Sequence, residues 1–238
     1  MNKKISLCVI VPFYNEEKFL EESVSRVLKL DIVDQIVLVD DCSIDDSYMI
    51  AEKIVAGNNR ISLTQTLLNE GKGSAIKRGL ELVSTSHVII HDADLEYFPE
   101  DIPELFNETM VYDDCLVIGS RTLGEKQRKN IYFYTYFGNK VLTLLFSVLN
   151  NHKLSDIASC YWLVKVETLK NINLSEKGFA VEVEVLSKFI KNNIKVIEVP
   201  IKYEARSYQD GKKIKLKDGL KIFFKILKYC KINIFTKY

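Results

Sequence analysis

The sequence predicts an α/β fold, with a Rossmann-like, mostly parallel sheet flanked by helices in a single domain. Two observations favour it. The first half alternates short β-branched apolar runs with polar, helix-length segments, and such alternation is typical of parallel strands joined by right-handed crossovers. The apolar runs are continuous rather than alternating, which indicates strands covered on both faces. A chain of 238 residues is long enough to bury the core that this arrangement needs.

The elements follow one another regularly through a Rossmann-like half at about residues 5–120. Apolar residues recur at helical spacing from Phe19 to Leu28, which supports the first crossover helix. The predicted strands are 5–11, 35–41, 61–67 and 87–94, and the predicted helices are 16–30, 47–58 and 73–85.

Composition excludes several classes of protein. A net charge of +1, with 47% hydrophobic and 27% charged residues, is ordinary for a globular protein and favours neither disorder nor nucleic-acid binding. Five scattered cysteines without a CxxC pair indicate neither a disulfide framework nor a zinc site. The first apolar run ends at Pro12 and acidic residues, so we interpret it as a strand rather than a secretion signal. A cytoplasmic location is expected.

The second half contains two unusual segments. Residues 131–150 are apolar over a membrane-spanning length, but Asn139 and Lys140 would be costly at the centre of a bilayer. We therefore expect a buried or membrane-surface helix there. The chain from Lys202 to Tyr238 carries eleven basic and three acidic residues. Within it, residues 214–238 predict a basic amphipathic helix, with Leu220, Phe223, Phe224 and Leu227 on one face and Lys221, Lys225 and Lys228 on another. The helix either lies on an anionic membrane surface or packs on the domain with its lysines in water.

Polar residues follow five successive predicted strands. Ligands of open parallel sheets bind at the carboxyl ends of the strands, so these residues are the first candidates for a site. They are Tyr14, Asn15, Glu16, Asp40, Asp41, Ser43, Asn69, Lys72, Asp92, Asp94, Gly119, Ser120 and Arg121.

The pair Asp92 and Asp94 has two interpretations. Aspartates at a strand-to-helix junction often cap the helix. Here Pro99, with Glu100 and Asp101 in the first turn, already supplies a helix start. The two carboxylates are then available for a hard divalent cation, and Mg²⁺ characteristically takes one or two carboxylates together with substrate phosphates.

The segment NEGKGSAIKRG, residues 69–79, is a candidate anion site. Its glycines allow close backbone approach, and Lys72 with a helix N-terminus attracts negative charge. It lacks the spacing of a Walker A loop, and a plain glycine turn remains an alternative. No GxGxxG follows the first strand, which argues against a dinucleotide dehydrogenase.

Taken together, the motifs resemble those of family 2 glycosyltransferases with a GT-A fold, most closely the dolichyl- or polyprenyl-phosphate mannose or glucose synthase branch. Their order and spacing over about 200 residues carry the likeness. The motifs are VIVPFYNE at 9–16, IVLVDDCSIDDS at 36–47, NEGKGSAIKRG at 69–79, HDADLEYFPEDI at 91–102, GSR at 119–121, FGNKVLT at 137–143, LSDIASCYWLVK at 154–165, GFAVEVEVLSK at 178–188 and VIEVPIKYEAR at 196–206.

The resemblance implies a domain at 1–213, with a nucleotide-sugar-binding half at 1–121 and an acceptor-side half at 122–213, followed by the basic helix at 214–238. It implies a DxD motif at Asp92 and Asp94 that binds Mg²⁺ or Mn²⁺, with Asp94 the direct ligand. It places Pro12, Tyr14, Glu16, Asp41, Ser43 and Lys72 at the nucleotide and its donor pocket. It places Arg121, Arg206 and Lys213 at the phosphate charge of the donor or the acceptor, and it gives Asp94 and Arg206 a catalytic role.

The implied reaction is inverting hexose transfer from GDP-mannose or UDP-glucose to a polyprenyl or dolichyl phosphate. A glycan hydroxyl is the alternative acceptor, and it would need a general base, for which Glu182 is the first choice and Glu184 the second. Both glutamates could instead form the wet face of a strand or an exposed first helical turn. Asp156 either positions an acceptor or caps a turn.

Two other classes of protein are disfavoured. A sugar-phosphate nucleotidyltransferase would carry a glycine-rich loop after the first strand, where this chain has PFYNE. A non-catalytic nucleotide-sugar-binding protein has no evident need for both DxD aspartates together with the basic residues.

Overall fold

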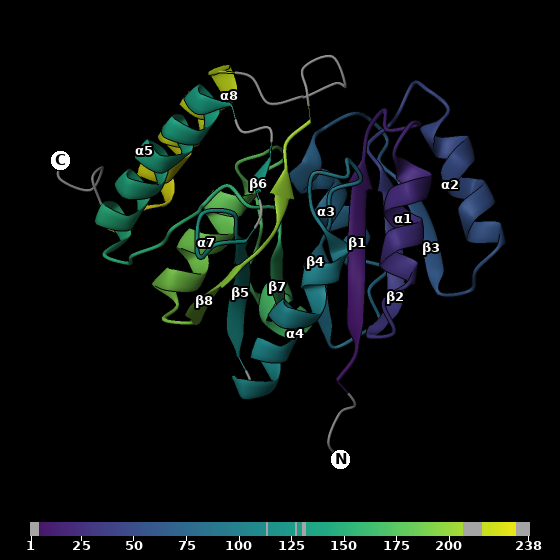
Figure 1. Cartoon of the computed structure of the whole chain (residues 1–238), viewed down its shortest axis with the longest axis horizontal. Coiled ribbons are helices and arrows are strands. Elements are labelled where there is room, and N and C mark those ends of the chain that lie inside the picture. The colour runs from purple at the N-terminus through teal and green to yellow at the C-terminus, as the bar shows by residue number, and fades with distance from the viewer. Residues whose placement is uncertain (1–4, 113, 127, 130–131, 207–215, 232–238) are drawn as a thin grey trace.

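The computed structural model describes residues 5–112, 114–126, 128–129, 132–206 and 216–231. A seven-stranded sheet has the order β3-β2-β1-β4-β7-β5-β8. Strand β7 is antiparallel to its two neighbours, and the other pairs are parallel. The α/β, mostly parallel sheet predicted from the sequence is confirmed (Figure 1). The strands are β1 Leu7–Phe13, β2 Val33–Asp40, β3 Ile61–Gln65, β4 His87–Ile90, β5 Cys115–Ser120, β7 Trp162–Lys165 and β8 Lys195–Pro200.

Helices cover both faces of the sheet and give three layers. Strand β1 shows why, because its alternate side chains are buried in two different cores: Cys8 and Ile10 in one, Leu7 and Val9 in the other. The first core includes residues of α3, α5, α7 and α8, and the second includes residues of α1, α2 and α4. The helices are α1 Leu20–Leu28, α2 Ser47–Ala56, α3 Lys72–Leu80, η1 Pro99–Asp101, α4 Ile102–Val111, α5 Phe133–Asn150, α6 Val166–Asn171, α7 Val181–Lys191 and α8 Leu216–Tyr229.

A second, two-stranded sheet brings together segments from the second half of the chain. It pairs β6, Arg128–Lys129, with β9, Tyr203–Glu204, and a bridge joins Tyr97 to Tyr203. The chain therefore returns, more than a hundred residues later, to the segment that follows Asp92 and Asp94.

Helix α8 packs on the domain, but not through the face that the sequence suggested. The helix contacts α5 and α7, and it buries Ile226 and Tyr229. The predicted apolar face is exposed at Leu220, Phe223 and Phe224. The helix therefore packs on the domain, as one of the two interpretations expected. It exposes apolar side chains as well as lysines to solvent, which that interpretation did not expect.

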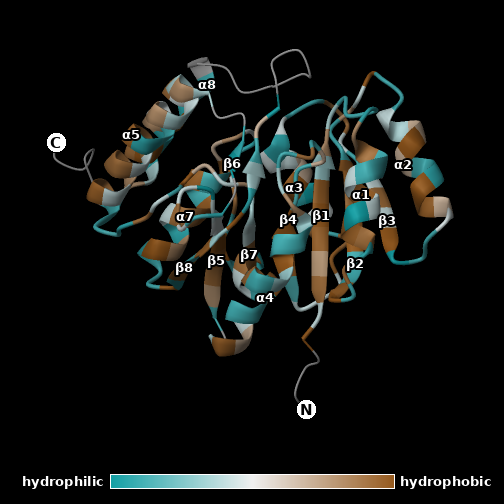
Figure 2. Cartoon of the chain, in the orientation of Figure 1, coloured by the Kyte–Doolittle hydropathy of each residue, from teal (hydrophilic) through white to brown (hydrophobic). Residues whose placement is uncertain are grey.

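Helix α5 also exposes apolar side chains. It coincides with the apolar segment at 131–150, and Figure 2 shows hydrophobic residues recurring along it beside α8. Within the described ranges, no helix is both long enough and apolar enough to cross a bilayer.

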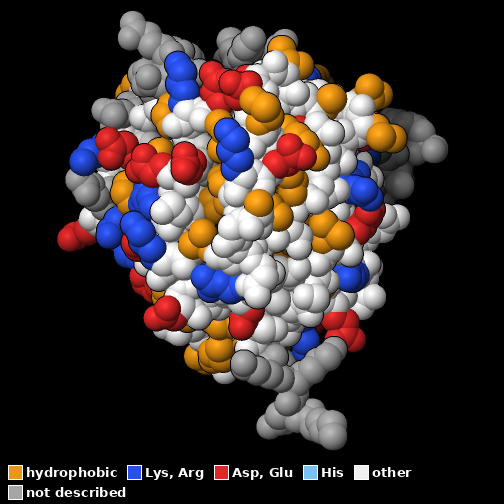
Figure 3. Space-filling view, turned by 90° about the vertical axis from the view of Figure 1, so that its right-hand side faces the viewer, with side chains coloured by type: hydrophobic (Ala, Val, Ile, Leu, Met, Phe, Trp, Pro, Cys, Tyr) orange, Lys and Arg blue, Asp and Glu red, His pale blue; other side chains and the backbone are white. Residues whose placement is uncertain are grey.

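The face of the molecule beside α2 and β3 has a mixed surface. Basic and acidic side chains are interspersed over the described residues of this face (Figure 3). Mixed charge of this kind does not form the basic track that nucleic-acid backbones require.

Candidate active site

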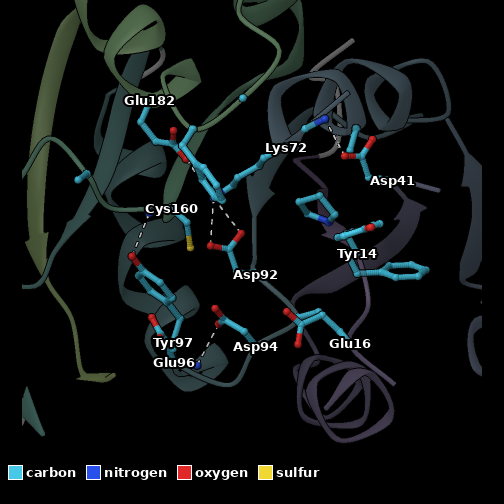
Figure 4. Close-up of a pocket in the computed structure, with 18 of the residues that line it drawn as sticks. Tyr14, Glu16, Asp41, Lys72, Asp92, Asp94, Glu96, Tyr97, Cys160 and Glu182 are labelled. Carbon is cyan, nitrogen blue, oxygen red and sulfur yellow. Dashed lines mark hydrogen bonds and ion pairs between the residues drawn. The ribbon is translucent and has the colours of Figure 1, made fainter. Parts of the chain in front are cut away.

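A cavity of about 400 Å³ lies at the carboxyl ends of the strands (Figure 4). Thirteen residues were assigned above to the donor, to phosphate charge, to the metal or to base catalysis. Ten of them line the cavity: Pro12, Tyr14, Glu16, Asp41, Lys72, Asp92, Asp94, Arg121, Glu182 and Arg206. They come from the ends of β1, β2, β4 and β5, from the first turns of α3 and α7, and from the segment after β9. The expected convergence of strand ends on one site is therefore what the structure has.

The segment after β4 directs its two aspartates to different partners. His91 is fully buried and hydrogen bonds with Ser23 and Tyr161 through its two ring nitrogens. Leu95 then adopts a left-handed conformation with φ 60°, and the Glu96 amide donates to Asp94 Oδ1 at 3.1 Å. Asp92 lies beside Lys72 and Asp94 lies apart from it, toward Glu16 (Figure 4).

Lys72 bridges two carboxylates at the cavity wall. Its Nζ lies 2.8 Å from Asp92 Oδ1 and 3.0 Å from Glu182 Oε1. Burial opposes its charge, but Asp92 and Glu182 outweigh burial and hold the pKa of Lys72 well above its usual value. Burial raises the pKa of Glu182 despite Lys72, and Glu182 Oε2 has no hydrogen-bond partner among the described residues.

Arg206 links Glu16, which follows β1, to Asp94, which follows β4. Its Nη1 and Nη2 lie 2.9 and 3.2 Å from the two oxygens of Glu16, and Nη2 also lies 3.1 Å from Asp94 Oδ2. Burial, with Glu96 and Asp92 nearby, raises the pKa of Asp94 to about 7 even though Arg206 opposes the shift. Arg206 therefore places a positive charge between the carboxylates of Glu16 and Asp94.

Arg121 is held by a residue that the sequence left ambiguous. Asp156 is fully buried and accepts from Arg121 Nε at 2.7 Å, Arg121 Nη2 at 2.9 Å and Asn139 Nδ2 at 3.0 Å. The guanidinium also stacks over the ring of Tyr203, 5.0 Å from its centroid. Asp156 Oδ1 also accepts from the Ala158 amide at 3.1 Å, so the interpretation of Asp156 as a turn cap is correct. The same carboxylate orients Arg121.

Asp41 lines the cavity and also shapes it. Its carboxylate accepts from the Gly71 amide at 2.7 Å, the Glu70 amide at 3.2 Å and the Thr66 hydroxyl at 2.9 Å. The loop before α3 is therefore held against the end of β2.

Three of the predicted site residues do not line the described cavity. The Ser43 hydroxyl bonds with Asp40 and accepts from the Asn15 amide, so it ties two loops together. Glu184 is fully buried but accepts from the amides of Ser175 and Glu176. The expectation of a wet strand face or an exposed first turn is wrong for this residue, because α7 begins inside the packed domain. Lys213 lies outside the described residues.

Sequence reasoning missed several lining residues. Glu96 lies beside Asp94 and accepts from the Tyr203 hydroxyl at 2.5 Å and the Arg206 amide at 2.8 Å. A signal existed, since Glu96 continues the two-residue spacing of Asp92 and Asp94. Phe179 and Ile222 also line the cavity, and Ile222 comes from α8, which no local pattern connects with the strand ends.

The cavity lining offers the carboxylate ligands that a hard divalent cation prefers, although these carboxylates are not already grouped around one point. Within the described ranges, no three Asp, Glu, His or Cys side chains are grouped as an ion site. Lys72 pairs with Asp92 and Arg206 pairs with Asp94. Carboxylates outnumber cations six to three in the lining, so negative charge remains for a divalent ion that brings phosphate oxygens with it. The carboxylates are those of Glu16, Asp41, Asp92, Asp94, Glu96 and Glu182, and the cations are those of Lys72, Arg121 and Arg206.

Residues 8–172 match the family model of glycosyl transferase family 2. The chain belongs to this family. It is a glycosyltransferase, and the resemblance inferred from its motifs is confirmed.

This family 2 glycosyltransferase is similar to enzymes of lipid-linked sugar transfer. It is 28% identical over 212 residues to a dolichol-phosphate mannosyltransferase of Pyrococcus furiosus, covering 87% of this chain and 59% of that one. It is 27% identical over 236 residues to a UDP-N-acetylglucosamine–dolichyl-phosphate N-acetylglucosaminyltransferase of Methanococcus voltae, covering 92% and 94% of the two chains.

The fold is also that of solved glycosyltransferases. A glucosyl-3-phosphoglycerate synthase from Mycobacterium tuberculosis in complex with UDP superposes with a TM-score of 0.74 at 20% identity, covering 96% of this chain and 81% of that one. The same enzyme has been solved with Mn²⁺, UDP and glucosyl-3-phosphoglycerate, and that structure has a TM-score of 0.72 at 19% identity, with 96% and 81% covered. The GT-A fold expected from the sequence is confirmed.

Proposed function

We propose that this glycosyltransferase transfers a hexose, with inversion, from a nucleotide sugar to a polyprenyl or dolichyl phosphate, with Mg²⁺ or Mn²⁺ at Asp92 and Asp94. The observation that carries the proposal is the composition of the cavity, because Asp92 and Asp94 line it together with Lys72, Arg121 and Arg206. Carboxylates beside fixed cations suit a metal-bound diphosphate better than a neutral ligand.

The donor occupies the side of the cavity formed by the first half of the chain. Tyr14 offers an aromatic face there and Asp41 a carboxylate, which suit the base and ribose, and Lys72 at the start of α3 suits the diphosphate. UDP-glucose and GDP-mannose are the leading donors. Both contain the diphosphate that these side chains address.

Negative charge develops on the leaving nucleoside diphosphate as the sugar departs. A bound Mg²⁺ or Mn²⁺ would neutralise part of this charge. Lys72 is already fixed by Asp92 and Glu182, and Arg121 is fixed by Asp156, so these cations need little reorganisation during the reaction. Arg206 is the third cation within reach of the phosphates.

A lipid phosphate is the favoured acceptor because its oxygen is anionic near neutral pH and needs little base catalysis. The outer surface of α5 suits such a substrate, since its exposed apolar side chains lie along one side of the helix and, from Tyr134 onward, recur every three or four residues. They are Phe133, Tyr134, Phe137, Val141, Leu144 and Val148. We call these residues the α5 stripe.

Helix α8 lies against α5 and exposes Leu220, Phe223 and Phe224 together with the strongly exposed Lys221 and Lys228. Apolar side chains flanked by lysines favour the surface of an anionic bilayer. A peripheral contact at the cytoplasmic face would bring the cavity close to a lipid-anchored phosphate.

A glycan hydroxyl is the second candidate acceptor. Glu182 favours it, since this glutamate lines the cavity, has a raised pKa and keeps one oxygen without a hydrogen-bond partner among the described residues. A carboxylate in that state can take the proton that a hydroxyl must lose.

The test is to incubate the purified protein with labelled UDP-glucose or GDP-mannose, polyprenyl phosphate and Mg²⁺ or Mn²⁺, and to measure label extracted into organic solvent. We expect lipid-linked label that requires metal and falls at least a hundredfold in Asp94→Asn, which removes one carboxylate from the cavity lining. The exposed Asp31→Asn is the matched control and should retain activity.

Two results would decide against the proposal. Label on an added oligosaccharide, with none in the organic phase, would establish the hydroxyl acceptor instead. Undiminished transfer by Asp94→Asn in the presence of a chelator would remove the role proposed for the metal.

A further inference from the structure

The segment Ser175–Gly178, between α6 and α7, connects helix α8 with the donor side of the cavity. The segment contacts α8 through the side chain of Glu176, which is only 8% exposed. This carboxylate accepts from the Tyr229 hydroxyl at 2.6 Å and from Lys225 Nζ at 2.7 Å, and Lys228 Nζ lies 3.5 Å away. Three side chains of α8 therefore converge on one buried glutamate.

The backbone of the same segment packs directly against the start of α3. The Lys177 carbonyl accepts from the Ser74 amide at 3.0 Å. A Cβ added at Gly73 would clash with the Glu176 carbonyl oxygen, and one at Gly71 would lie 2.9 Å from that of Lys177. Gly71 also has φ 103°, which L side chains rarely adopt. These glycines are thus required for the approach of this segment.

The segment is also fixed from behind by α7. The buried carboxylate of Glu184 accepts from the Ser175 amide at 2.8 Å and from the Glu176 amide at 2.8 Å. The segment is therefore hydrogen bonded to α7 through the Ser175 and Glu176 amides and to α3 through the Lys177 carbonyl.

Lys72 is the charged cavity residue that lies closest in sequence to this contact. It lies between Gly71 and Gly73, its Nζ reaches Asp92 and Glu182, and both Gly71 and Gly178 line the cavity. The position of α8 is therefore linked through Glu176, and through the backbone that packs on two glycines, to the cation that faces the donor.

We infer that Glu176 is a positioning residue through which helix α8 fixes the start of α3, and with it Lys72, for the diphosphate of the donor. This inference rests on the proposed function, because it requires a nucleotide diphosphate in the cavity. Loss of the anchor leaves Asp92, Asp94 and Arg206 in place but misplaces Lys72, so it weakens donor binding more than it slows a saturated enzyme.

The test is calorimetric titration of the intact chain with UDP and with GDP in the presence of Mn²⁺. Glu176→Gln keeps the shape of the side chain but removes the charge that holds both lysines, and we expect the Kd of the nucleotide to rise about tenfold. Tyr229→Phe removes one hydroxyl donor, and we expect a smaller rise, about threefold. In the double variant, we expect the rise in Kd to be smaller than the product of the two single effects, because both substitutions act on the same contact.

Glu100→Gln is the matched control. Glu100 also pairs with a basic residue on a neighbouring helix, Arg26, at 2.8 Å, but this pair lies outside the cavity lining. Its removal should leave nucleotide affinity unchanged. A merely structural role for Glu176 would lower the thermal midpoint of unfolding and leave the Kd of the folded protein, and the KM for the donor, unaltered.

The outcomes separate this inference from the proposed function. If the wild-type chain binds neither UDP nor GDP, the proposed donor is wrong. If the wild type binds one of them and the folded Glu176→Gln and Tyr229→Phe variants bind it equally well, the donor proposal stands and the positioning role of Glu176 is wrong.

Discussion

Arg121 and Asp156 form a bidentate ion pair, with Nε–Oδ2 and Nη2–Oδ1 distances of 2.7 and 2.9 Å. Burial alone would raise the pKa of Asp156, but Arg121 outweighs burial and lowers it. Asp156→Asn leaves the guanidinium buried without its counter-charge, so we expect a loss of about 3 kcal/mol in the free energy of unfolding at pH 7. Urea unfolding monitored by circular dichroism measures this change.

The exposed pair Arg78 and Glu81 provides the control for Asp156→Asn. Its side chains are about half exposed, so Glu81→Gln should cost roughly 0–1 kcal/mol. Equal costs for the two variants would show that the Arg121–Asp156 pair contributes no more than a surface pair.

Lys72→Met tests the cation that bridges Asp92 and Glu182. The substitution keeps the length of the side chain but leaves two carboxylates without their shared partner at the donor site. We expect kcat/KM for the nucleotide sugar to fall by about a hundredfold, in line with the loss of one charge from a preorganised site. Lys77→Met, further along the same helix and outside the cavity lining, should stay within about threefold of wild type, allowing for the ordinary effect of a surface substitution. Similar losses in both variants would argue against a specific role for Lys72.

Glu182 and Glu184 have separate expected phenotypes. With a lipid-phosphate acceptor, Glu182→Gln should lower kcat by less than about tenfold, whereas a hydroxyl acceptor that depends on this base would lose about 10²–10⁴. Glu184→Gln should act on stability, because Glu184 accepts from Ser175 and Glu176 rather than facing the cavity. The measurements are steady-state transfer to each acceptor and thermal unfolding. A large loss of kcat in a stable Glu184→Gln variant would contradict this division.

The α5 stripe should contribute to membrane contact. Phe137→Ser and Leu144→Ser each remove an exposed apolar side chain, and each should weaken binding to anionic vesicles about tenfold if burial of that side chain in the bilayer is worth roughly 1.5 kcal/mol. Vesicle flotation measures the bound fraction. Met49→Ser removes a similarly exposed apolar side chain on α2 and should change nothing. Flotation that is equal for all four proteins would exclude the α5 stripe as a membrane contact.

The sequence was informative wherever strand order alone fixes position. Asp92 and Lys72 could be placed at one site because parallel strands end at the same edge of a sheet, and the structure brings their side chains to 2.8 Å. The same rule misplaced Ser43. A hydroxyl at a strand end can also satisfy its neighbours, and Ser43 bonds with Asp40 instead of facing the cavity.

Long-range packing accounts for what the sequence left undetermined. Glu184 alternates with valines, which suggested a solvated face, but the segment before α7 covers it through the Ser175 and Glu176 amides. Ile222 lines the cavity from α8, although its local pattern indicates only an amphipathic helix. Contacts between residues so far apart in the chain leave no periodic signal in either segment.

The anchor between Glu176 and α8 should also give the fold a pH dependence. Burial raises the pKa of Glu176, but hydrogen bonds from Lys225 and Tyr229 outweigh it, so the folded-state pKa lies below the usual value. A lowered folded-state pKa means that the stabilisation is fully present above the unfolded pKa of about 4.3 and is lost as the pH falls through the folded-state pKa. We expect wild type to exceed Glu176→Gln by about 2 kcal/mol in the free energy of unfolding at pH 7, with the two converging below about pH 4. Urea unfolding of both proteins between pH 3 and 7 measures the difference, and a gap that stays constant across this range would mean that the charge of Glu176 does not anchor α8.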